Sequence, residues 1–344
     1  MTKVTSVSPI DLSIVVVSYN VRELLAQCLE SVVSSQLTVA RQALSLTTDD
    51  WRLTTEIFVV DNASRDGSAA MVRERFPSVR LIENANNRGF AAANNQAFAE
   101  TRGRYVLMLN PDTVARGGAL ETLVKFMDAH ASRRAGVCGG KLLYSDGTLQ
   151  HSAFAFPTLA QIFLDFFPLH WRLTDSRLNG RYPRARYARG EPFLIDHPLG
   201  ADLMVRRDAA QQIGWLDDQF FIYCEEIDWC IRIKRAGWQI WCVPQAEIVH
   251  HEAQSTRQFR EAMFVELWRA RARLFDKHYS RSFRFAARQI IRAGLSNEAR
   301  KARAAAHVGR VTQDELKTRL EAYEQVRTIF AKWTYRNQGW YYSK

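Results

Sequence analysis

The chain has 344 residues, of which 47 are Lys or Arg, 36 are Asp or Glu, and 47% are hydrophobic. This composition excludes an intrinsically disordered chain, and 17 glycines with 9 prolines exclude a collagen-like or low-complexity protein. No run approaches the roughly 18 apolar residues of a membrane span, and five cysteines without a CxxC pair disfavour disulfides and a zinc site, which fits a reducing cytoplasm.

The net charge of +11 is unevenly distributed along the chain. Residues 1–254 hold 27 basic and 28 acidic side chains, for a net charge of −1, whereas residues 255–344 hold 20 basic and 8 acidic ones, for +12. The sequence therefore predicts a neutral body and a basic C-terminal region. Such a region suits an anionic partner, either a membrane surface or nucleic acid.

Short apolar runs alternate with helical patterns over the first 112 residues. The pattern predicts strands at 12–20, 56–62, 79–84 and 105–112, and helices at 21–35, 68–76 and 91–101. Apolar strands separated by helices indicate an α/β fold with a mostly parallel central sheet covered by helices on both faces. Residues 37–55 interrupt the alternation and are interpreted as an insertion.

Polar clusters follow three of these strands, at the edge of the sheet where such folds bind ligands. Helix capping explains any one cluster about equally well, whereas three clusters at one edge favour a shared site. Neither GxGxxG nor GxxxxGK[ST] occurs, which argues against a nicotinamide-dependent enzyme and a P-loop ATPase. The clusters are Ser18-Tyr19-Asn20, Asp61-Asn62-Ala63-Ser64 and Asn110-Pro111-Asp112.

Five motifs occur in a fixed order along residues 11–252. They are VVVSYN (15–20), VVDNASRDGS (59–68), NNRGFAAANNQA (86–97), LNPDT (109–113) and FFIYCEEIDWCIRIKRAGW (220–238). With them the chain resembles the family-2 glycosyltransferases, especially the rhamnosyltransferase-like branch that builds bacterial surface polysaccharides. The resemblance implies a GT-A fold in a catalytic domain at 1–254, with a nucleotide-binding half at about 11–115 and an acceptor-binding half at about 116–254.

The resemblance also implies an activity. A nucleotide-diphosphosugar donor, dTDP-rhamnose or a UDP-sugar, would give its sugar with inversion to a hydroxyl of a lipid-linked glycan, in the presence of Mg²⁺ or Mn²⁺. The alternative is a catalytically inactive protein of the same fold that binds a sugar nucleotide or a glycan.

Metal ligation is expected at Asp112 and His250. The family has Asp-x-Asp where this chain has Asn110-Pro111-Asp112, so only Asp112 carries a charge. Its carboxylate suits a hard divalent ion. The resemblance implies His250 as a further ligand, with neighbouring His251 as the alternative.

The general base is expected among Glu225, Glu226 and Asp228, because the acceptor hydroxyl must lose a proton as it attacks. The family places its base at the position of Glu226, where it usually has Asp. The longer side chain displaces the carboxylate, which motivates the inactive alternative. Arg232, four residues after Asp228, is expected to form a helix-face ion pair with it.

The remaining site residues are expected to bind the nucleotide sugar. Trp215 and Trp238 suit either sugar stacking or core packing. The expected contacts are Ser18, Tyr19, Asn20, Asp61, Asn62, Arg88, Gly89, Asn95, Asn110, Gly200 and Ala201.

The basic region at 255–344 is predicted to be helical. Arg281, Arg284, Arg288 and Arg292 share one helix face, and Phe283, Ala287, Ile290 and Ile291 lie largely on another. This pattern fits an amphipathic helix on anionic lipid, or equally a surface helix packed on the protein. Gly294 is predicted to end that helix, and a second helix is predicted at 314–330. We expect a cytoplasmic protein held peripherally at the inner face of the cytoplasmic membrane, and no nucleic acid, because no nucleic-acid module accompanies the charge.

Overall fold

The computed structural model describes residues 10–42, 53–130, 134–251 and 260–331, arranged in two compact units. The first unit comprises Met1–Phe156, Arg181–Phe221 and Glu225–Ser255. The second comprises Pro157–Gly180, Ile222–Cys224 and Thr256–Lys344. The structure thus groups Pro157–Gly180 with the C-terminal helices, whereas the sequence placed it in the acceptor-binding half. That segment has two arginines and two aspartates, so the units keep net charges of −1 and +12.

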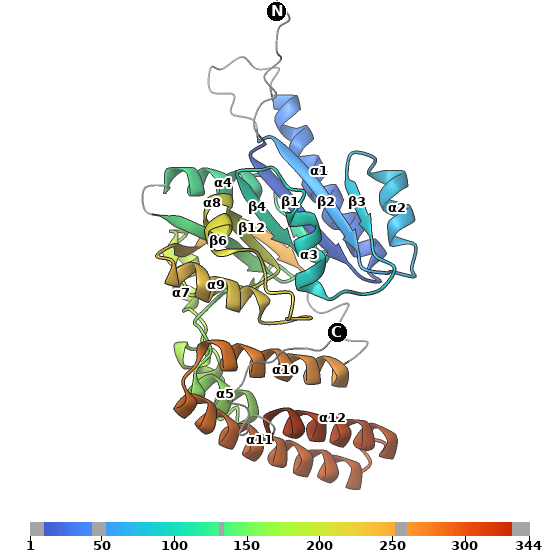
Figure 1. Ribbon diagram of the computed structural model, residues 1–344, viewed down its shortest axis with the longest axis vertical. Helices are drawn as coiled ribbons and strands as arrows, with labels where there is room; N and C mark the ends of the chain where they lie inside the picture. Colours follow the sequence, from blue (N-terminus) through green and yellow to red (C-terminus); the bar gives the residue numbers. More distant parts are fainter. Residues whose placement is uncertain (1–9, 43–52, 131–133, 252–259, 332–344) are drawn as a thin grey trace, which may run out of the picture. The chain divides into compact units, whose positions relative to one another are not determined.

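A ten-stranded mixed sheet forms the first unit, and its main path runs β3-β2-β1-β4-β11-β6-β12-β5 (Figure 1). β3, β2, β1 and β4 are parallel, as are β6 and β12, whereas β11 is antiparallel to β4 and β6, and β5 is antiparallel to β12. The strands on this path are β1 Leu12–Ser18, β2 Thr55–Asp61, β3 Arg80–Glu83, β4 Tyr105–Leu109, β5 Thr113–Ala115, β6 Ala135–Leu143, β11 Asp202–Arg206 and β12 Gln239–His250.

The described residues of the first unit also form four short strands. β7 (Leu149–Gln150) pairs with β6, and β9 (Phe193–Leu194) pairs with β12. β8 (Ala153–Phe154) and β10 (His197–Pro198) form a separate two-stranded sheet.

Helices cover both faces of the large sheet and enclose two hydrophobic cores. Along β1, Ile14 and Val16 face one core, and Val15 and Val17 face the other, as strand geometry requires. The predicted α/β fold is therefore confirmed. The first core is covered by α1 Arg22–Gln42, α2 Ser68–Arg75 and α4 Ala119–Ala129, and the second by α3 Phe90–Phe98, α7 Arg184–Ala188, α8 Arg207–Ile213 and α9 Glu225–Arg235.

The predicted strands and helices of the nucleotide-binding half all occur, with boundaries shifted by a few residues. The main correction concerns the expected insertion at 37–55. Its first part continues α1 as far as Gln42, so it is helix rather than an interruption. Residues 43–52 of the expected insertion lie outside the described residues.

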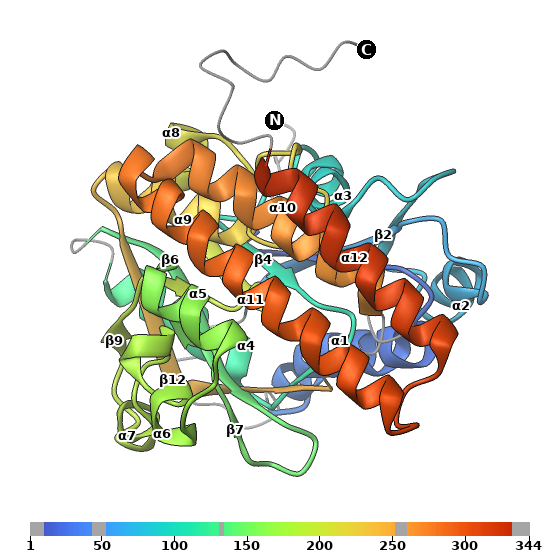
Figure 2. The ribbon, with the colours of Figure 1, turned by 90° about the horizontal axis from the view of Figure 1, so that it is seen from below.

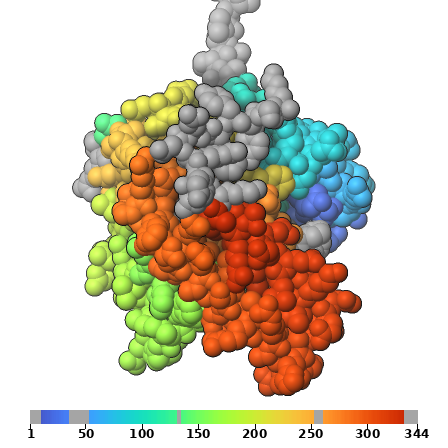
Figure 3. Space-filling view, turned by 60° about the horizontal axis from the view of Figure 1, so that its bottom comes forward, coloured from blue at the N-terminus to red at the C-terminus, as the bar shows by residue number. Residues whose placement is uncertain are grey.

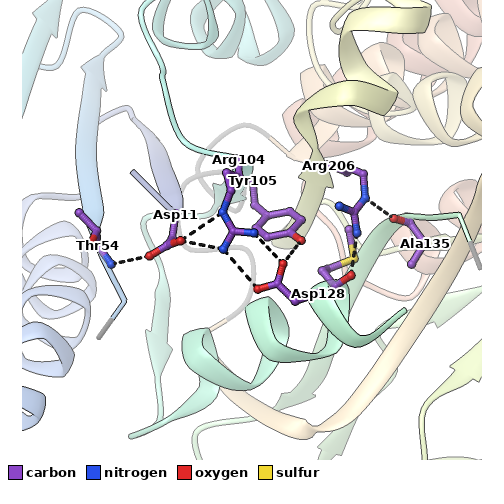
Figure 4. A network of polar contacts seen from close by, with 8 residues as sticks. Asp11, Thr54, Arg104, Tyr105, Asp128, Ala135 and Arg206 are labelled. Carbon is purple, nitrogen blue, oxygen red and sulfur yellow. Dashed lines mark hydrogen bonds and ion pairs between the residues drawn. The ribbon is translucent and has the colours of Figure 1, made fainter. Parts of the chain in front are cut away.

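A polar network closes the amino-terminal edge of the sheet (Figure 4). Arg104 donates to Asp11 Oδ1 from Nη2 (2.7 Å) and to Asp128 Oδ1 from Nη1 (2.7 Å), and the Tyr105 hydroxyl also donates to Asp128 Oδ1 (2.6 Å). The other oxygen of Asp11 accepts the Thr54 amide at 3.0 Å. These contacts join β1, β2, β4 and α4.

The second unit is helical (Figure 2). α11 lies between α5 and α12, and α10 packs on α12. Phe166 of α5 stacks on Trp268 of α10, with ring centroids 5.0 Å apart, and its ring also contacts Gly294. The helical elements are α5 Leu159–Phe166, α6 Trp171–Thr174, the 3₁₀ turn η2 Arg177–Asn179, α10 Arg260–His278, α11 Arg281–His307 and α12 Gln313–Ala331.

The structure corrects the prediction that Gly294 ends a helix, since α11 continues through it to His307. Gly294 lies inside the helix because the Phe166 ring occupies the place that a Cβ would take. The predicted helix at 314–330 is present as α12.

The apolar face of α11 is used inside its own unit. Ala287 and Ile291 are fully buried, while Arg281 and Arg292 are exposed. The helix is therefore a packed surface helix, and it does not present Ala287 and Ile291 to lipid. None of the helices in the described part of the chain is long and apolar enough to cross a membrane.

Candidate active site

Two buried polar atoms lie side by side where β1 and β2 end. Ser18 and Asp61 are register partners in the parallel pair. Asp61 Oδ2 accepts the Ser64 amide at 3.0 Å, but Asp61 Oδ1 and Ser18 Oγ have no hydrogen-bond partner among the described residues. Buried polar atoms are rarely left unsatisfied, so this pair marks a place where a ligand can donate and accept hydrogen bonds.

Asn20 links the loops that follow the same two strands. Its side-chain Oδ1 accepts a hydrogen bond from the Arg65 backbone amide at 2.7 Å, and its backbone amide donates to Ser64 Oγ at 3.0 Å. It takes a left-handed backbone conformation with φ 53°, which Asn tolerates better than most residues. Asn20 therefore shapes the rim of the site, beside the half-buried Tyr19.

Asn62 holds the loop that carries Arg88. Its Nδ2 donates to Asn87 Oδ1 (2.8 Å) and to the Gly89 carbonyl (3.2 Å), and its Oδ1 accepts the Arg88 amide (3.0 Å). Asn84 donates to the same oxygen at 3.1 Å. Asn62, predicted as a ligand contact, thus directs its amide to the protein, while the Arg88 side chain is exposed.

Gly89 is required where this loop meets Phe221. Its φ is 83°, and a Cβ there would lie 2.5 Å from the Phe221 carbonyl oxygen. That oxygen accepts the Phe90 amide at 2.6 Å. The predicted ligand contact Asn95 is likewise engaged, because its amide exchanges two hydrogen bonds with the backbone of Leu216, at 2.8 and 3.2 Å.

Strand pairing brings Asp112 to His250. β5 starts directly after Asp112 and pairs with β12 in a register that sets Thr113 opposite His250, and the His251 amide donates to the Asp112 carbonyl at 2.8 Å. His250 Nε2 then lies 3.3 Å from Asp112 Oδ1. Both residues are buried, with 5% and 6% of their surface exposed. His251 contacts Ser145 Oγ instead, at 2.8 Å, so it does not join this pair.

Gln150 sets the orientation of the His250 ring. Its Oε1 lies 3.0 Å from His250 Nδ1, and because an amide oxygen only accepts, Nδ1 carries a proton. His250 Nε2, which faces the Asp112 carboxylate, then either carries a proton and donates it or presents a lone pair. In the latter state the two groups form a nitrogen and oxygen pair suited to a divalent cation. Within the described ranges no group of three or more His, Cys, Asp or Glu residues is arranged around one metal position, so these ranges offer a pair.

Backbone contacts connect this pair to the start of α9. The Asn110 amide donates to the Ala201 carbonyl at 3.0 Å, which ties the Asn110-Pro111-Asp112 turn to the strand entry at Gly200. A Cβ on Gly200 would lie 3.5 Å from Cγ and 3.6 Å from Cδ of Glu226. The turn that carries Asp112, the Gly200-Ala201 segment and Glu226 therefore lie next to one another.

Glu225 and Glu226 occupy the first turn of α9, and each has a buried Oε2 without a hydrogen-bond partner among the described residues. Burial raises the pKa of Glu226 to about 7. Burial, with the neighbouring Glu226 charge, also raises the pKa of Glu225 well above its ordinary value. The two residues before this turn, Tyr223 and Cys224, have φ of 71° and 65°, a strained conformation that often accompanies functional sites.

Asp228 has a different environment from the two glutamates. Its Oδ2 accepts Arg232 Nε at 2.8 Å, which is the expected ion pair, and Arg232 also donates to the carbonyls of Ile213 (3.0 Å) and Trp215 (2.7 Å). Asp228 thus anchors a loop on α9. The Trp215 ring packs against Phe98 at 4.9 Å between centroids, which favours core packing over sugar stacking.

One residue of this region, Gln150, has no counterpart in the sequence predictions, and a second, Asp202, has an environment that the sequence does not reveal. Gln150 comes from a two-residue strand and orients His250, and no local pattern in the sequence marks it. Asp202 is buried at the start of β11, where burial raises its pKa to about 7 and the Gly140 amide donates to its Oδ2. The family resemblance of this segment suggests Asp202, with Gly200 and Ala201, as a lining residue of the sugar pocket.

Comparison with known proteins gives consistent matches. The model of the family described as "Glycosyl transferase family 2" matches residues 13–214. An N-acetylglucosaminyl-diphospho-decaprenol L-rhamnosyltransferase of Mycobacterium tuberculosis is 32% identical over 218 residues, which cover 58% of this chain and 67% of that protein. Rhamnosyltransferase WbbL of Escherichia coli is 26% identical over 219 residues, which cover 61% and 73%.

Solved structures support the same fold. A Pyrobaculum calidifontis mannosyltransferase in complex with GDP-Man and Mn²⁺ aligns with a TM-score of 0.52 at 15% identity, over 97% of this chain and 89% of that one. GalNAc-T7 with UDP, GalNAc and Mn²⁺ also aligns with a TM-score of 0.52 at 15% identity, over 76% and 48%. These neighbours confirm the expected GT-A fold.

Proposed function

The chain belongs to glycosyl transferase family 2, and on that premise we propose that it transfers rhamnose from a nucleotide-diphosphosugar to a hydroxyl of a lipid-linked glycan. The observation that carries the proposal is that the Asn110 amide ties the turn before Asp112 to Ala201, and that Gly200 beside it lies against the Glu226 side chain. The names of the relatives support rhamnose as the sugar and a diphospholipid-linked sugar as the acceptor. A role in cell-envelope polysaccharide synthesis is part of the same proposal.

The nucleotide is bound at the carboxyl ends of β1 and β2. Asp61 Oδ1 accepts a hydrogen bond from a base imide or a ribose hydroxyl, and Ser18 Oγ, its register partner, supplies a donor or an acceptor. The exposed guanidinium of Arg88 approaches the diphosphate. Asn62 and Gly89 act as positioning residues for that loop.

Asp112 and His250 hold the divalent cation, Mg²⁺ or Mn²⁺. The fit rests on the buried 3.3 Å pair and on Gln150, which directs the Nε2 lone pair towards the carboxylate. A pair of protein ligands leaves room for phosphate oxygens and water, which is the usual arrangement around nucleotide-bound Mg²⁺. When bound, the cation neutralises charge that develops on the leaving diphosphate.

Glu226 takes the proton from the acceptor hydroxyl. Its carboxyl lies against Gly200, where no side chain fills the space, and its raised pKa is close to that of an efficient base at neutral pH. Glu225 is more deeply buried and favours its protonated form, and Asp228 is committed to Arg232. These differences favour Glu226 among the three candidates.

The competing proposal is a catalytically inactive protein that binds a sugar nucleotide or a glycan. It is motivated by Glu226 where the family usually has Asp. Both proposals predict donor binding, and only the transferase predicts product.

The experiment screens nucleotide sugars with Mg²⁺ or Mn²⁺ for thermal stabilisation and then assays transfer of the stabilising donor to a diphospholipid-linked sugar. We expect a nucleotide-diphosphosugar to raise the melting temperature only with the metal present. Asp112→Asn should reduce turnover by at least about 100-fold and weaken metal binding, whereas the exposed Asp208→Asn should leave both unchanged. Full activity of Asp112→Asn would refute the assignment, and binding without product would favour the inactive alternative.

The location of the protein is part of the same proposal. A lipid-linked acceptor lies at a membrane, and the +12 charge of the helical unit suits the anionic inner face of the cytoplasmic membrane. Charge alone gives reversible attraction that salt weakens.

A further inference from the structure

The exposed apolar residues of this chain are concentrated in one short segment. Nine large hydrophobic residues are exposed in the described part of the chain, and four of them lie between Phe163 and Leu178. Leu169 is 68% exposed, Trp171 66% and Leu178 55%. Such a concentration on a folded surface marks an interaction site.

The segment is firmly anchored at one end. Ile162, Leu164 and Phe166 of α5 are buried in the helical unit, and Phe166 is held between Trp268 and Gly294. In Figure 3 the green atoms of the segment form an open surface beside the orange helices of the same unit. The anchored helix therefore supports an apolar surface that the unit itself does not cover.

Several polar groups of this surface are paired within the segment itself. His170 Nδ1 accepts the Arg172 amide at 3.2 Å, Ser176 Oγ accepts the Leu178 amide at 3.2 Å, and Asn179 Nδ2 donates to the Thr174 carbonyl at 2.8 Å. α6 and η2 also pack on each other. A segment whose polar groups are paired locally can enter a poorly hydrated environment at low cost.

The chemistry of the surface fits the headgroup region of a bilayer. Trp is favoured at that depth because its ring is apolar and its N–H is polar. The Arg172 guanidinium lies 5.5 Å from the centre of the Trp171 ring, so its charge can reach phosphate while the ring enters the acyl boundary. The unit that carries the segment has a net charge of +12.

We propose that Leu169, Trp171 and Leu178 insert into the interface of an anionic phospholipid bilayer and anchor the helical unit there. α11 contributes charge through exposed residues such as Arg281 and Arg292, while its buried Ala287 and Ile291 do not insert. Insertion and charge together give the two signals that stable peripheral binding requires.

The first test measures binding of the full chain to vesicles of phosphatidylglycerol and phosphatidylcholine by co-sedimentation, without metal or sugar nucleotide. Changing Leu169, Trp171 and Leu178 together to Ser should weaken binding by about tenfold or more. A matched variant with Ser at the exposed Tyr144 and Leu194 should bind as the wild type does. Unchanged binding of the triple variant, or no vesicle binding by the wild type, would overturn the proposal.

The second test reports insertion directly. All five cysteines are buried, so Leu169→Cys provides an exposed thiol for an environment-sensitive dye. We expect a blue shift of the dye with anionic vesicles and none for the same dye at Leu194→Cys. Insertion would be refuted if the dye at residue 169 stayed in water while the protein was bound to vesicles. It would also be refuted if the wild type self-associated and the three substitutions made the protein monomeric. Transfer to a water-soluble acceptor should be unchanged in the triple variant, so this proposal and the proposed activity can fail separately.

Discussion

The two edges of the large sheet use polar residues in opposite ways. At the amino-terminal edge, Arg104 joins Asp11 and Asp128 in a network that also engages the Tyr105 hydroxyl and a backbone amide. At the carboxyl-terminal edge, Ser18 Oγ and Asp61 Oδ1 are buried without partners among the described residues. One edge thus contributes stability, and the other keeps hydrogen-bonding capacity for a ligand.

The strongest test is Glu226→Gln, which replaces the proposed base in the first turn of α9 by an amide of about the same size. Turnover should fall by about 10² to 10⁴-fold, because the Gln amide cannot take up the proton that the attacking hydroxyl loses. Donor binding, followed by thermal stabilisation, should be retained. The exposed Glu74→Gln is the matched control, and wild-type turnover in Glu226→Gln would remove the proposed base.

Asp61→Asn tests the carboxyl-terminal edge of the sheet, where the nucleotide is proposed to bind. The loss of a charged acceptor from a buried position should raise the donor KM by about 10 to 100-fold. The stability of the free protein should change little or increase, because the carboxylate is buried and half-satisfied. A lower melting temperature with an unchanged donor KM would make Asp61 a structural residue like those at the opposite edge.

The pH profile of turnover should follow Glu226. A base acts only when deprotonated, and burial raises its pKa to about 7, so kcat should increase with pH and level off above that value. Below it, each pH unit should reduce kcat about tenfold. A profile that is flat down to the ordinary range of a glutamate would contradict the assigned environment.

Arg104→Ala tests the amino-terminal edge and should have the smallest effect. The free energy of unfolding should fall by only about 1–2 kcal/mol. The Thr54 amide still donates to Asp11 and the Tyr105 hydroxyl to Asp128, and solvent can reach the carboxylate oxygens that Arg104 leaves. Urea unfolding measures this change, with Arg102→Ala as an exposed control. The kcat of the folded protein should not change, and a large loss of kcat would show that the two edges are coupled.

The order of elements could be predicted from sequence because it depends on local patterns. β1 and β2 are apolar throughout, and the polar residues that follow them mark the ligand edge. These signals located Asp61 at the end of β2 and Asp112 in the turn that follows β4. The i, i+4 spacing also predicted the ion pair between Asp228 and Arg232.

The partners of individual side chains depend on long-range pairing and could not be predicted. The choice of His250 over His251 follows from the register of β5 and β12. Asn62 and Asn95 bind loops whose positions only the folded chain defines. Burial of Ile291 and continuation of α11 through Gly294 depend on tertiary packing, which helix periodicity does not reveal.

The order of the strands limits how this protein can be recombined with its relatives. β11 lies between β4 and β6, and β5 lies across the sheet beside β12, so the two halves of the chain are interleaved in space. A chimera joined after residue 115 would pair a foreign β12 with the native β5 and would have to rebuild the contact between Asp112 and His250. We therefore expect donor preference to diverge through side chains at the strand ends, and not through exchange of whole halves.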